Sequence, residues 1–481
     1  MSFEEQLTPY GMLPSNLRVC RLGDLCVENG IQTGPFGSQL HKEDYAAEGT
    51  PILTVEHLGD NRIIHNKLPL VSDNDKARLI KFTLKAGDIV FSRVGSVDRR
   101  ALVQKSEDGW LFSGRCLRVR PDIAKIDPHW LSHFLGLPAF KSFIRGVAVG
   151  ATMPSINTKI LSDILIYYPS LAIQKKNAKL LTAIENKISC NQKVNQILEQ
   201  MAQALFKSWF VDFEPVKAKI AVLEAGGSQE DATLAAMTVI SGKAVDALMV
   251  FEHEHPEQYA ELKAMAELFP SAMQESELGE IPEAWHHGPL SNIATFANGK
   301  VDVCSLTPET YISTENMLEN RAGISTASSL PSTNSVPEFR FGHVLISNIR
   351  PYFKKIWLAR FKGGRSADVL AFETLGSVTI EYVYNLLYQE TFFNFMMQTS
   401  KGVKMPRGDK KSIMGWQCIH PDKKISNAFS KAVGEYYSFI EINNAQNKTL
   451  TQLRDTLLPK LLSGEITLPE TEQAVSEVEN V

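Results

Sequence analysis

Basic and amide side chains follow two predicted turns in the first quarter of the chain, and these side chains could bind a nucleic acid. The first group comes directly after residues 34–38 (GPFGS), and the second after the apolar run at residues 89–91. Arginine is the best reader of a guanine edge, asparagine and glutamine suit adenine, and lysine mostly holds phosphate. The candidate DNA-contacting residues here are Gln39, His41, Lys42, Arg93, Arg99 and Arg100.

A similar group of side chains lies in the last third of the chain. Each of these residues taken alone fits ordinary surface solubility, but the clusters as groups favour DNA. The Met-Pro pairs at residues 153–154 and 405–406 are predicted to be packing and turn elements rather than contacts. The candidates in this part of the chain are Asn348, Arg350, Tyr352, Lys354, Lys355, Lys401, Lys404 and Arg407.

The sequence lacks the motifs that an enzyme acting on nucleic acids would carry. It has no Gly-x-x-x-x-Gly-Lys-[Ser/Thr] phosphate loop and no Asn-Pro-Pro-aromatic tetrapeptide of the kind that amino-methyltransferases use to hold a flipped base. Its six cysteines are scattered without zinc spacing. Residues 253–255 (HEH) fit solvated charge better than a metal site, because adjacent residues on a helix point in different directions. We predict no catalytic, cofactor or metal site on this chain.

The chain contains an internal repeat. The Met-Pro pair at residues 153–154 returns at 405–406, and the same offset of 252 residues links Gly150 with Gly402. Upstream the offset drifts to 255 for GDIVFSRVG against GHVLISNIR, as changes in loop length would cause. Four blocks recur in the same order, which indicates internal duplication.

Each copy ends in a long predicted helix. Apolar residues recur at threes and fours from just after Pro169 to about Phe210, and again from about Lys423 to Leu462. Because each apolar stripe needs a partner, we expect the two helices to pack on each other as an antiparallel coiled coil. The stripes consist of Leu180, Ile184, Ile188, Val194, Ile197, Leu198, Met201 and Leu205 in the first helix, and of Val433, Tyr436, Ile440, Leu450, Leu453, Leu457 and Leu458 in the second.

Short strand and helix patterns interleave in each copy without clean βαβ periodicity, which predicts an α+β fold. The clearest strands lie around residues 89–91 and 164–166. The predicted architecture is two pseudo-repeated globular parts separated by two long helices packed as an antiparallel coiled coil. The predicted boundaries are 1–170 for the first globular part, 171–213 for the central helix, 214–276 for an acidic helical insert packed beside that helix, 277–422 for the second globular part, 423–465 for the C-terminal helix and 466–481 for a flexible tail.

Composition agrees with several folded domains. The chain has 481 residues, of which 44% are hydrophobic and 22% charged. The net charge of −4 is uneven, because residues 214–284 carry 14 acidic and four basic side chains while both globular parts are mildly basic. No run of 18 apolar residues and no secretory signal occurs, so we expect no membrane partner and a cytoplasmic location with reduced thiols.

The order of these motifs resembles the specificity (S) subunits of type I restriction–modification systems. The resemblance covers both halves and both helices, and the shared order is more specific than any one motif. The second copy of the opening loop, at residues 296–316, departs from it by lacking the Pro-Phe-Gly-Ser turn. The matching stretches are GPFGSQLHKEDYAAEGTPIL (34–53), GDIVFSRVG (87–95), GATMPSINTK (150–159), ILEQMAQALFKSWFVDFEPVKAK (197–219), SELGEIPEAW (276–285) and LRDTLLPKLLSGEI (453–466).

The resemblance implies that residues 1–170 and 277–422 are target-recognition domains. Each would read one half of a bipartite, asymmetric sequence in double-stranded DNA. The helices would act as spacers that dock methyltransferase (M) subunits, and restriction (R) subunits would join that core. The resemblance also implies that this chain is a non-catalytic subunit, with S-adenosylmethionine, ATP and Mg²⁺ bound by its partners.

Two other functions stay open at the level of sequence. A self-sufficient DNA-modifying enzyme that shares the recognition domains would need a further domain with cofactor motifs, and no stretch of the chain is left to form one. A coiled-coil scaffold without a role on DNA would give no reason for two diverged globular copies.

Overall fold

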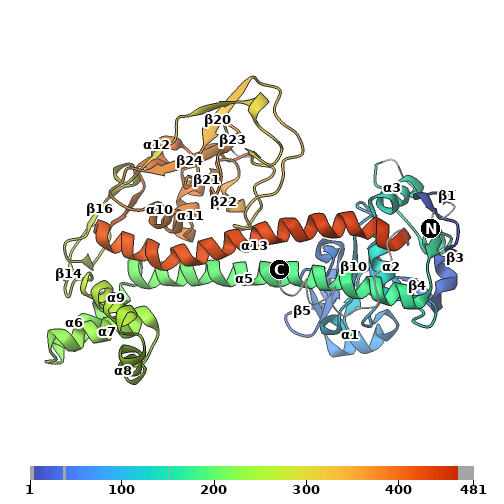
Figure 1. The fold of residues 1–481 in the computed structure, drawn as a ribbon, viewed down its shortest axis with the longest axis horizontal. Coiled ribbons are helices and arrows are strands. Elements are labelled where there is room, and N and C mark those ends of the chain that lie inside the picture. The colour runs from blue at the N-terminus through green and yellow to red at the C-terminus, as the bar shows by residue number, and fades with distance from the viewer. Residues whose placement is uncertain (1–4, 36–38, 151, 403, 464–481) are drawn as a thin grey trace. The chain divides into compact units, whose positions relative to one another are not determined.

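The computed structural model describes residues 5–35, 39–150, 152–402 and 404–463, so the tail expected at 466–481 lies outside the described residues. The chain forms two compact units, residues 1–191 with 444–481 and residues 192–443. Each unit contains one globular domain and one segment of each of two long helices, α5 (Leu171–Phe210) and α13 (Lys423–Ser463). Within each unit these helix segments run side by side in opposite directions (Figure 1).

The first globular domain is built on a five-stranded sheet in the order β4-β12-β9-β10-β7, antiparallel except for the last pair. Its strand β9 has Ile89, Val90 and Phe91 fully buried, because the strand is covered on both faces. A second sheet has the order β11-β6-β8-β5, and β13 pairs with β3. The bounds are β1 (Glu5–Thr8), β2 (Gly11–Pro14), β3 (Arg18–Arg21), β4 (Cys26–Thr33), β5 (Tyr45–Ala46), β6 (Thr50–Leu53), β7 (Asp60–Asn61), β8 (Leu70–Val71), α1 (Asp73–Arg78), β9 (Ile89–Ser92), β10 (Arg100–Leu102), β11 (Leu111–Phe112), β12 (Cys116–Pro121), α2 (Pro128–Phe134), α3 (Pro138–Val147), α4 (Thr158–Ser162) and β13 (Leu165–Tyr168).

The second globular domain repeats the central part of the first. Its main sheet has the order β17-β24-β21-β22, which matches β4-β12-β9-β10, and β16 pairs with β25 as β3 pairs with β13. A further sheet has the order β18-β20-β23-β19. The bounds are β14 (Met273–Gln274), β15 (Ile281–Pro282), β16 (His286–Pro289), β17 (Ala294–Phe296), β18 (Lys300–Asp302), β19 (Tyr311–Ile312), β20 (Ser335–Phe339), β21 (Val344–Ser347), η9 (Pro351–Phe353), β22 (Ile356–Leu358), β23 (Gly363–Arg365), β24 (Val369–Thr374), α10 (Ile380–Leu387), α11 (Glu390–Gln398), α12 (Lys410–Met414) and β25 (Gln417–His420).

The predicted α+β class, with duplicated globular parts and paired long helices, is confirmed. The main sheets of the two domains share one strand order, so the duplication indicated by the sequence offsets is also present in the fold. In each copy a helix pair follows the sheet, α2 with α3 and α10 with α11, and packs into the same core as the long helices.

The predicted apolar stripes of the long helices are only partly buried. Leu180 and Ile184 of α5 share a core with Leu450 and Leu458 of α13 and with the first domain. Three stripe residues of α5, Val194, Ile197 and Met201, are instead 39%, 55% and 45% exposed. Helical periodicity identifies an apolar face, but it does not say whether another element covers that face.

Polar pairs join the two helices where the apolar stripe is exposed. In one unit the Nδ2 of Asn191 donates to the Oδ1 of Asn447 at 3.0 Å, and in the other the Nδ2 of Asn443 donates to the Oδ1 of Asn195 at 2.8 Å. At the repeat offset of 252 residues, Asn191 corresponds to Asn443 and Asn195 to Asn447, so the second pair is the first with the two helices exchanged. The duplicated helices therefore keep both the residue type and its partner. Buried Asn pairs fix register and orientation in helical pairs at some cost in stability.

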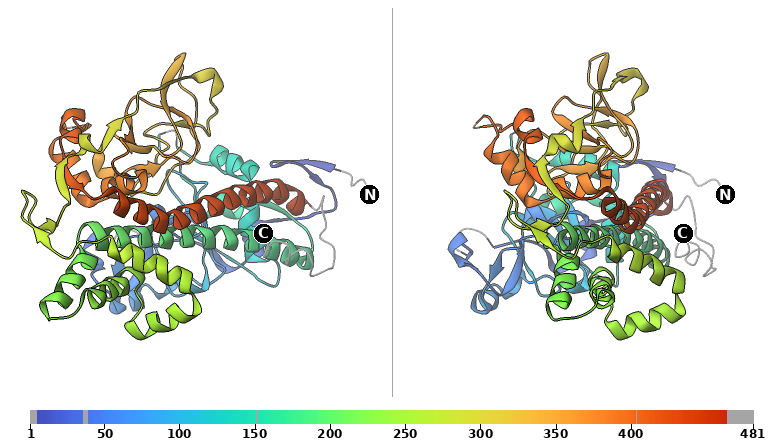
Figure 2. Two further views of the ribbon diagram at one scale, coloured as in Figure 1. Left: turned by 60° about the vertical axis from the view of Figure 1, so that its left-hand side comes forward. Right: turned by 90° about the vertical axis from the view of Figure 1, so that its left-hand side faces the viewer.

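The acidic insert is helical, as predicted, and consists of α6 (Glu214–Glu224), α7 (Gln229–Ser241), α8 (Val245–Glu254) and α9 (Pro256–Glu267). Its helices gather at the C-terminal end of α5 (Figure 2), where the rings of Trp209 and Phe269 lie 5.0 Å apart. The buried Nζ of Lys219 donates to the carbonyls of Ala266 and Phe269 at 2.9 and 2.6 Å and so ties α6 to the segment that ends the insert. Burial lowers the pKa of the Lys219 ammonium.

Among the described residues no single helix is long and apolar enough to span a membrane; only α7 and α8 taken together, with an 87° bend between them, meet that test by length and composition.

Candidate nucleic-acid interface

Two loops lie side by side at the end of strand β9 in the first domain. The first, the strand-end loop, starts at Arg93, and the second, the Met-Pro loop, is closed by two backbone hydrogen bonds between Val149 and Ser155 at 2.8 and 2.9 Å. The carbonyl of Pro154 accepts from the amide of Gly95 at 2.8 Å and holds the loops together. The carbonyl of Arg93 also accepts from the amide of Ile156 at 3.0 Å.

The second domain has the same pair of loops at the end of strand β21. Here the Met-Pro loop is closed by two hydrogen bonds between Lys401 and Arg407, both at 2.9 Å. The carbonyl of Pro406 accepts from the amide of Arg350 at 2.8 Å, as that of Pro154 does from Gly95. The repeated Met-Pro phrase thus builds the same two-loop unit in both domains, and the turn role predicted for it is confirmed.

The methionines of these phrases do not pack in the core. Met153 is 65% exposed and Met405 is 52% exposed, whereas the Met-Pro pairs had been predicted to be packing elements. That part of the prediction is wrong for the methionines, because the proline carbonyl makes the anchoring contact and leaves the preceding side chain outside.

The candidate residues of the first domain are placed in two loops that flank the turn at residues 113–116. The amide of Gly34 donates to the carbonyl of Cys116, and a Cβ on Gly34 would collide with the backbone of Ser113, which explains a glycine there. Gln39 is partly buried and His41 exposed beyond it, while the side chain of Lys42 and the turn residues 36–38 lie outside the described part of the chain. On the other side of the turn the Nη1 of Arg93 donates to the carbonyl of Gly114 at 3.1 Å, so the structure brings these loops together.

Arg99 and Arg100 are neighbours in sequence but lie in opposite environments. Arg99 is exposed, whereas Arg100 is only 4% exposed and donates from Nε to the carbonyl of Ser132 at 2.7 Å. Its Nη1 lies 3.6 Å from the Oδ1 of Asp60. Burial lowers the pKa of the Arg100 guanidinium, and Asp60 partly offsets that effect. The DNA-contact prediction for Arg100 is therefore corrected, because both faces of β10 are covered and this side chain lies against α2.

The candidates of the second domain also divide into exposed and structural residues. Asn348 is 3% exposed, and among the described residues no hydrogen-bond donor reaches its Oδ1. The Nζ of Lys354 lies 2.7 Å from the Oε2 of Glu390, and the Nζ of Lys355 donates to the carbonyl of Thr314 at 2.8 Å. Lys355 therefore ties the loop to Thr314, and burial takes the Asn348 side chain out of reach of DNA, which corrects the contact predicted for it. The exposed candidates are Arg350, Tyr352, Lys401, Lys404 and Arg407.

Two of the exposed cations have acidic neighbours. Lys401 lies 3.0 Å from Asp409 and Arg407 lies 2.7 Å from Asp368. The side chains of Lys401 and Arg407 remain 81% and 55% exposed, so exchange of these pairs for phosphate contacts would cost little. The amide of Ser412 and Lys401 together lower the pKa of Asp409 to about 2.

A strained backbone supports the strand-end loop of the second domain. Arg350 and Lys354, at either end of η9, both have φ of 50°, and Asn320 and Arg321 opposite them have φ of 54° and 63°. The amides of Asn320 and Arg321 donate to the carbonyls of Phe353 and Lys354 at 2.8 and 3.0 Å. Left-handed conformations at non-glycine residues cluster at binding sites because the surrounding contacts must enforce them.

Sequence reasoning missed the supporting residue Arg321. Its guanidinium lies 3.0 Å from Glu390 and 4.8 Å from the ring centre of Tyr388. No local signal marks it, since left-handed backbone is usually signalled by glycine or asparagine.

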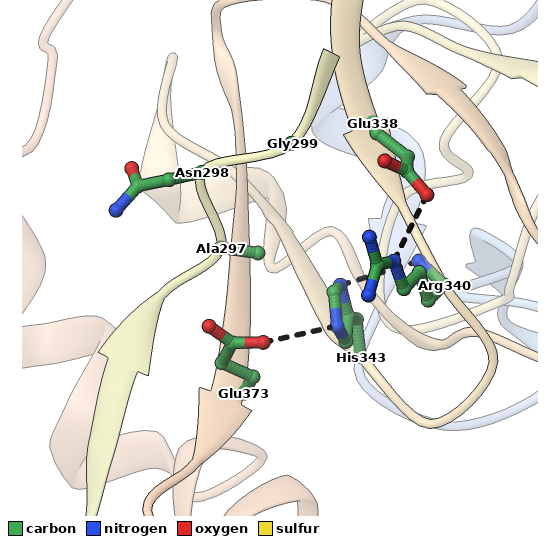
Figure 3. A pocket seen from close by; sticks show the side chains of 7 residues that line it. All are labelled: Ala297, Asn298, Gly299, Glu338, Arg340, His343 and Glu373. Carbon is green, nitrogen blue, oxygen red and sulfur yellow. Dashed lines mark hydrogen bonds and ion pairs between the residues drawn. The ribbon is translucent and has the colours of Figure 1, made fainter. Parts of the chain in front are cut away.

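A separate polar pocket of about 260 Å³ lies in the same domain (Figure 3). In it the Nε of Arg340 lies 2.9 Å from Glu338, and the Nε2 of His343 lies 3.4 Å from Glu373. The Nδ1 of His343 accepts from the amide of Arg340 at 3.2 Å, so both imidazole nitrogens are engaged. Burial lowers the pKa of His343. Because Nδ1 accepts from the Arg340 amide and Nε2 faces Glu373, neither nitrogen offers a free lone pair for general-base catalysis.

A family model described as "Type I restriction modification DNA specificity domain" matches residues 14–200. The chain is 27% identical over 434 residues to the type I restriction enzyme HindI specificity subunit of Haemophilus influenzae, covering 85% of this chain and 92% of that protein. It is 28% identical over 209 residues to a putative type I restriction enzyme MjaX specificity subunit of Methanocaldococcus jannaschii, covering 42% of this chain and 47% of that protein.

Among solved structures, the type I restriction–modification S subunit of M. genitalium aligns with a TM-score of 0.48 and 15% identity over 95% of this chain and 99% of that one. The match to the HindI subunit covers 85% of this chain and therefore extends into both globular domains. Residues 14–200 thus match a type I restriction modification DNA specificity domain, and the chain as a whole is similar to type I restriction enzyme specificity subunits.

Proposed function

We propose that this chain is the DNA-reading specificity subunit of a type I restriction–modification enzyme and that it recognises a bipartite, asymmetric target. The observation that carries the proposal is the duplicated two-loop unit, which appears once in each globular domain with the same backbone hydrogen bonds and different side chains. A shared frame with diverged loops suits a protein that reads two unlike half-sites. Two half-sites on one face of B-DNA lie about one turn, ~34 Å, apart.

The DNA-contacting residues that we propose are the candidates of the first domain other than the buried Arg100, and the exposed candidates of the second domain. In the first domain they combine amide, imidazole, ammonium and guanidinium groups, and in the second they are four cations and one tyrosine. Lysines and exposed arginines hold phosphate, while Arg and Gln at the loops suit base edges. They are Gln39, His41, Lys42, Arg93 and Arg99 in the first domain, and Arg350, Tyr352, Lys401, Lys404 and Arg407 in the second.

Methyltransferase subunits are the partners that we propose for the long helices. Within residues 192–443, α5 exposes Val194, Ile197 and Met201, and α13 exposes Phe439 (54%) and Ile442 (62%). Exposed apolar side chains grouped on helices are typical of protein–protein interfaces. Restriction subunits would join that core. S-adenosylmethionine, ATP and Mg²⁺ would bind to those partners, in the cytoplasm, and this chain would contribute no catalytic group.

The first test is genome-wide mapping of methylated adenine in cells that express this chain with its cognate M subunit. Recovery of one bipartite asymmetric motif, with modified adenines on opposite strands about one turn apart, is the expected result. Omission of this chain, with the M subunit still expressed, is the matched control and should abolish the motif.

Two results would point to the other functions. Methylation by this chain without an M subunit would indicate a self-sufficient modifying enzyme. A stable complex with M that marks no motif would indicate a scaffold and would contradict the DNA-reading proposal.

A further inference from the structure

The tips of the two Met-Pro loops have the same geometry in both domains. Gly150 and Gly402 open the loops with φ of 108° and 95°. A Cβ on these glycines would lie 2.8 and 3.2 Å from the carbonyl oxygens of Met153 and Met405. Both the positive φ and the close approach therefore favour glycine, and both loops are built to turn the chain sharply before the methionine.

In both domains this loop geometry leaves a large apolar side chain exposed to solvent. Scattered exposed apolar residues are ordinary on protein surfaces. Here, however, Met153 and Met405 occupy equivalent positions of two copies in which most other loop residues have diverged, ATMPS against VKMPR. They are 65% and 52% exposed, so neither stabilises its own domain through core packing.

The charge around the methionines indicates what covers them. In the second domain Lys401, Lys404 and Arg407 are exposed residues of the same loop as Met405, and the amide of Arg350 donates to the carbonyl of the next residue, Pro406. In the first domain Pro154 is bonded in the same way to Gly95, two residues after Arg93. An exposed methionine at a loop tip fits a DNA groove, where it can contact a thymine methyl group or a base step while nearby cations of the loops hold phosphates.

We infer that Met153 and Met405 are base-contacting residues, one for each half-site of the double-stranded DNA target. This inference rests on the proposed function and adds to it an apolar reading element that the two domains share. The polar surroundings of the two tips differ, because Val149, Thr152 and Ser155 stand where the second domain has Lys401, Lys404 and Arg407. The first half-site is therefore read with more apolar contact and the second with more phosphate contact.

Oxidation footprinting of the full chain, alone and bound to its M subunits, tests the inference. Dilute hydrogen peroxide converts exposed methionines to sulfoxides, which peptide mass spectrometry quantifies. The probes are a 40-base-pair duplex carrying the motif found by methylation mapping and a duplex with that motif scrambled. We expect the motif duplex to slow oxidation of Met153 and Met405 at least fivefold. Met249, which is 65% exposed on α8 of the insert, is the control and should oxidise at the same rate throughout.

Substitution provides a second readout on the assembled complex. Met405→Ala and Met153→Ala should each weaken binding to the motif duplex about tenfold, the effect expected for loss of one base contact. Met405→Leu keeps the apolar volume and should stay within about twofold of the unmodified chain, and Met249→Ala should have no effect.

The outcomes separate this inference from the proposed function. If the motif duplex still binds more tightly than the scrambled one while both methionines oxidise freely, the inference is wrong and the proposed function stands. Protection that appears on adding M subunits before DNA would assign the tips to a protein contact and would also overturn it. If the two duplexes bind equally, the proposed function fails and the inference fails with it.

Discussion

Adjacent residues of the same type have different roles in this protein. Arg99 and Arg100 look equivalent in sequence, yet one is exposed and the other donates to a backbone carbonyl inside the first domain. Arg100 also packs against Gly136, where an added methyl group would overlap its guanidinium. A buried guanidinium of this kind stabilises the fold, and an exposed one is available to DNA.

Substitution of the two arginines should separate stability from DNA binding. Arg100→Met leaves the Ser132 carbonyl without its donor and should lower the free energy of unfolding by about 2–4 kcal/mol. Arg99→Ala should leave stability within about 0.5 kcal/mol of the unmodified chain and weaken DNA binding. Urea denaturation and duplex binding measure the two effects, and a stable Arg100→Met protein would show that the burial of this residue matters little.

A partly buried carboxyl on α5, in the unit of residues 192–443, should make stability depend on pH. Glu199 of α5 accepts from the hydroxyl of Tyr384 at 3.1 Å, and burial raises the pKa of its carboxyl from the ordinary value of 4.5 to about 7. Because the folded-state pKa is raised, the stabilisation is fully present below pH 4.5 and is lost as the pH rises towards 7.

Glu199→Gln removes that titration. Relative to the variant, the unmodified chain should lose about 1–2 kcal/mol of unfolding free energy between pH 5 and 8, a value reduced for the partial exposure of this group. Parallel curves for both proteins in thermal denaturation across that range would contradict the prediction. Glu381→Gln, a change in the same domain at a carboxyl near Ser430, is a matched control for loss of one acidic group.

At the scale of elements, the strand-end loops of the two domains form the same turn with different residues. The first copy places Gly95 at φ of 80°, while the second places Arg350 at φ of 50° in the equivalent position. The left-handed region costs a non-glycine residue roughly 1 kcal/mol. The second domain accepts this cost at a loop where an arginine side chain is exposed.

Arg350→Gly should therefore stabilise the second domain by about 0.5–1 kcal/mol and weaken DNA binding. Urea denaturation and duplex binding should move in opposite directions, which is the signature of strain retained for binding. Equal or lower stability of the variant would mean that other contacts of Arg350 outweigh the backbone strain.

The polar pairs between α5 and α13 are the second feature at this scale. Asn191→Leu alone leaves the Asn447 amide without this partner and should lower the free energy of unfolding by about 1–2 kcal/mol. The double variant Asn191→Leu/Asn447→Leu should recover or exceed the original stability, because an apolar pair replaces a polar one. Urea denaturation of the three proteins, arranged as a double-mutant cycle, tests the coupling. Additive effects would contradict a direct interaction.

At the scale of the whole molecule, the duplication predicts that the two halves of the target are read independently. Replacement of residues 1–170 by the corresponding domain of another family member should change one half of the methylated motif and leave the other half intact. Methylation mapping of the chimaera with the same M subunit measures this directly. Simultaneous change of both halves would indicate that the two domains do not read separate half-sites.

The sequence by itself determined the repeat, the fold class and the resemblance to type I restriction enzyme specificity subunits. Helix stripes, strand patterns and the 252-residue offset can be read from the sequence alone, because they depend only on periodicity and on the order of residues in the chain. The α+β architecture with two paired helices followed from those signals, and so did the turn formed by each Met-Pro pair.

Only the tertiary structure decided which side chains are available to a ligand. It placed Arg100 and Asn348 inside their domains, exposed Met153 and Met405, and left part of the apolar stripe of α5 uncovered. Burial depends on which distant element packs against a residue, and local sequence does not encode that partner. The left-handed backbone at Arg350 could not be predicted from the sequence either. Arginine ordinarily avoids that conformation, and here it occurs beside hydrogen bonds from the distant residues 320 and 321.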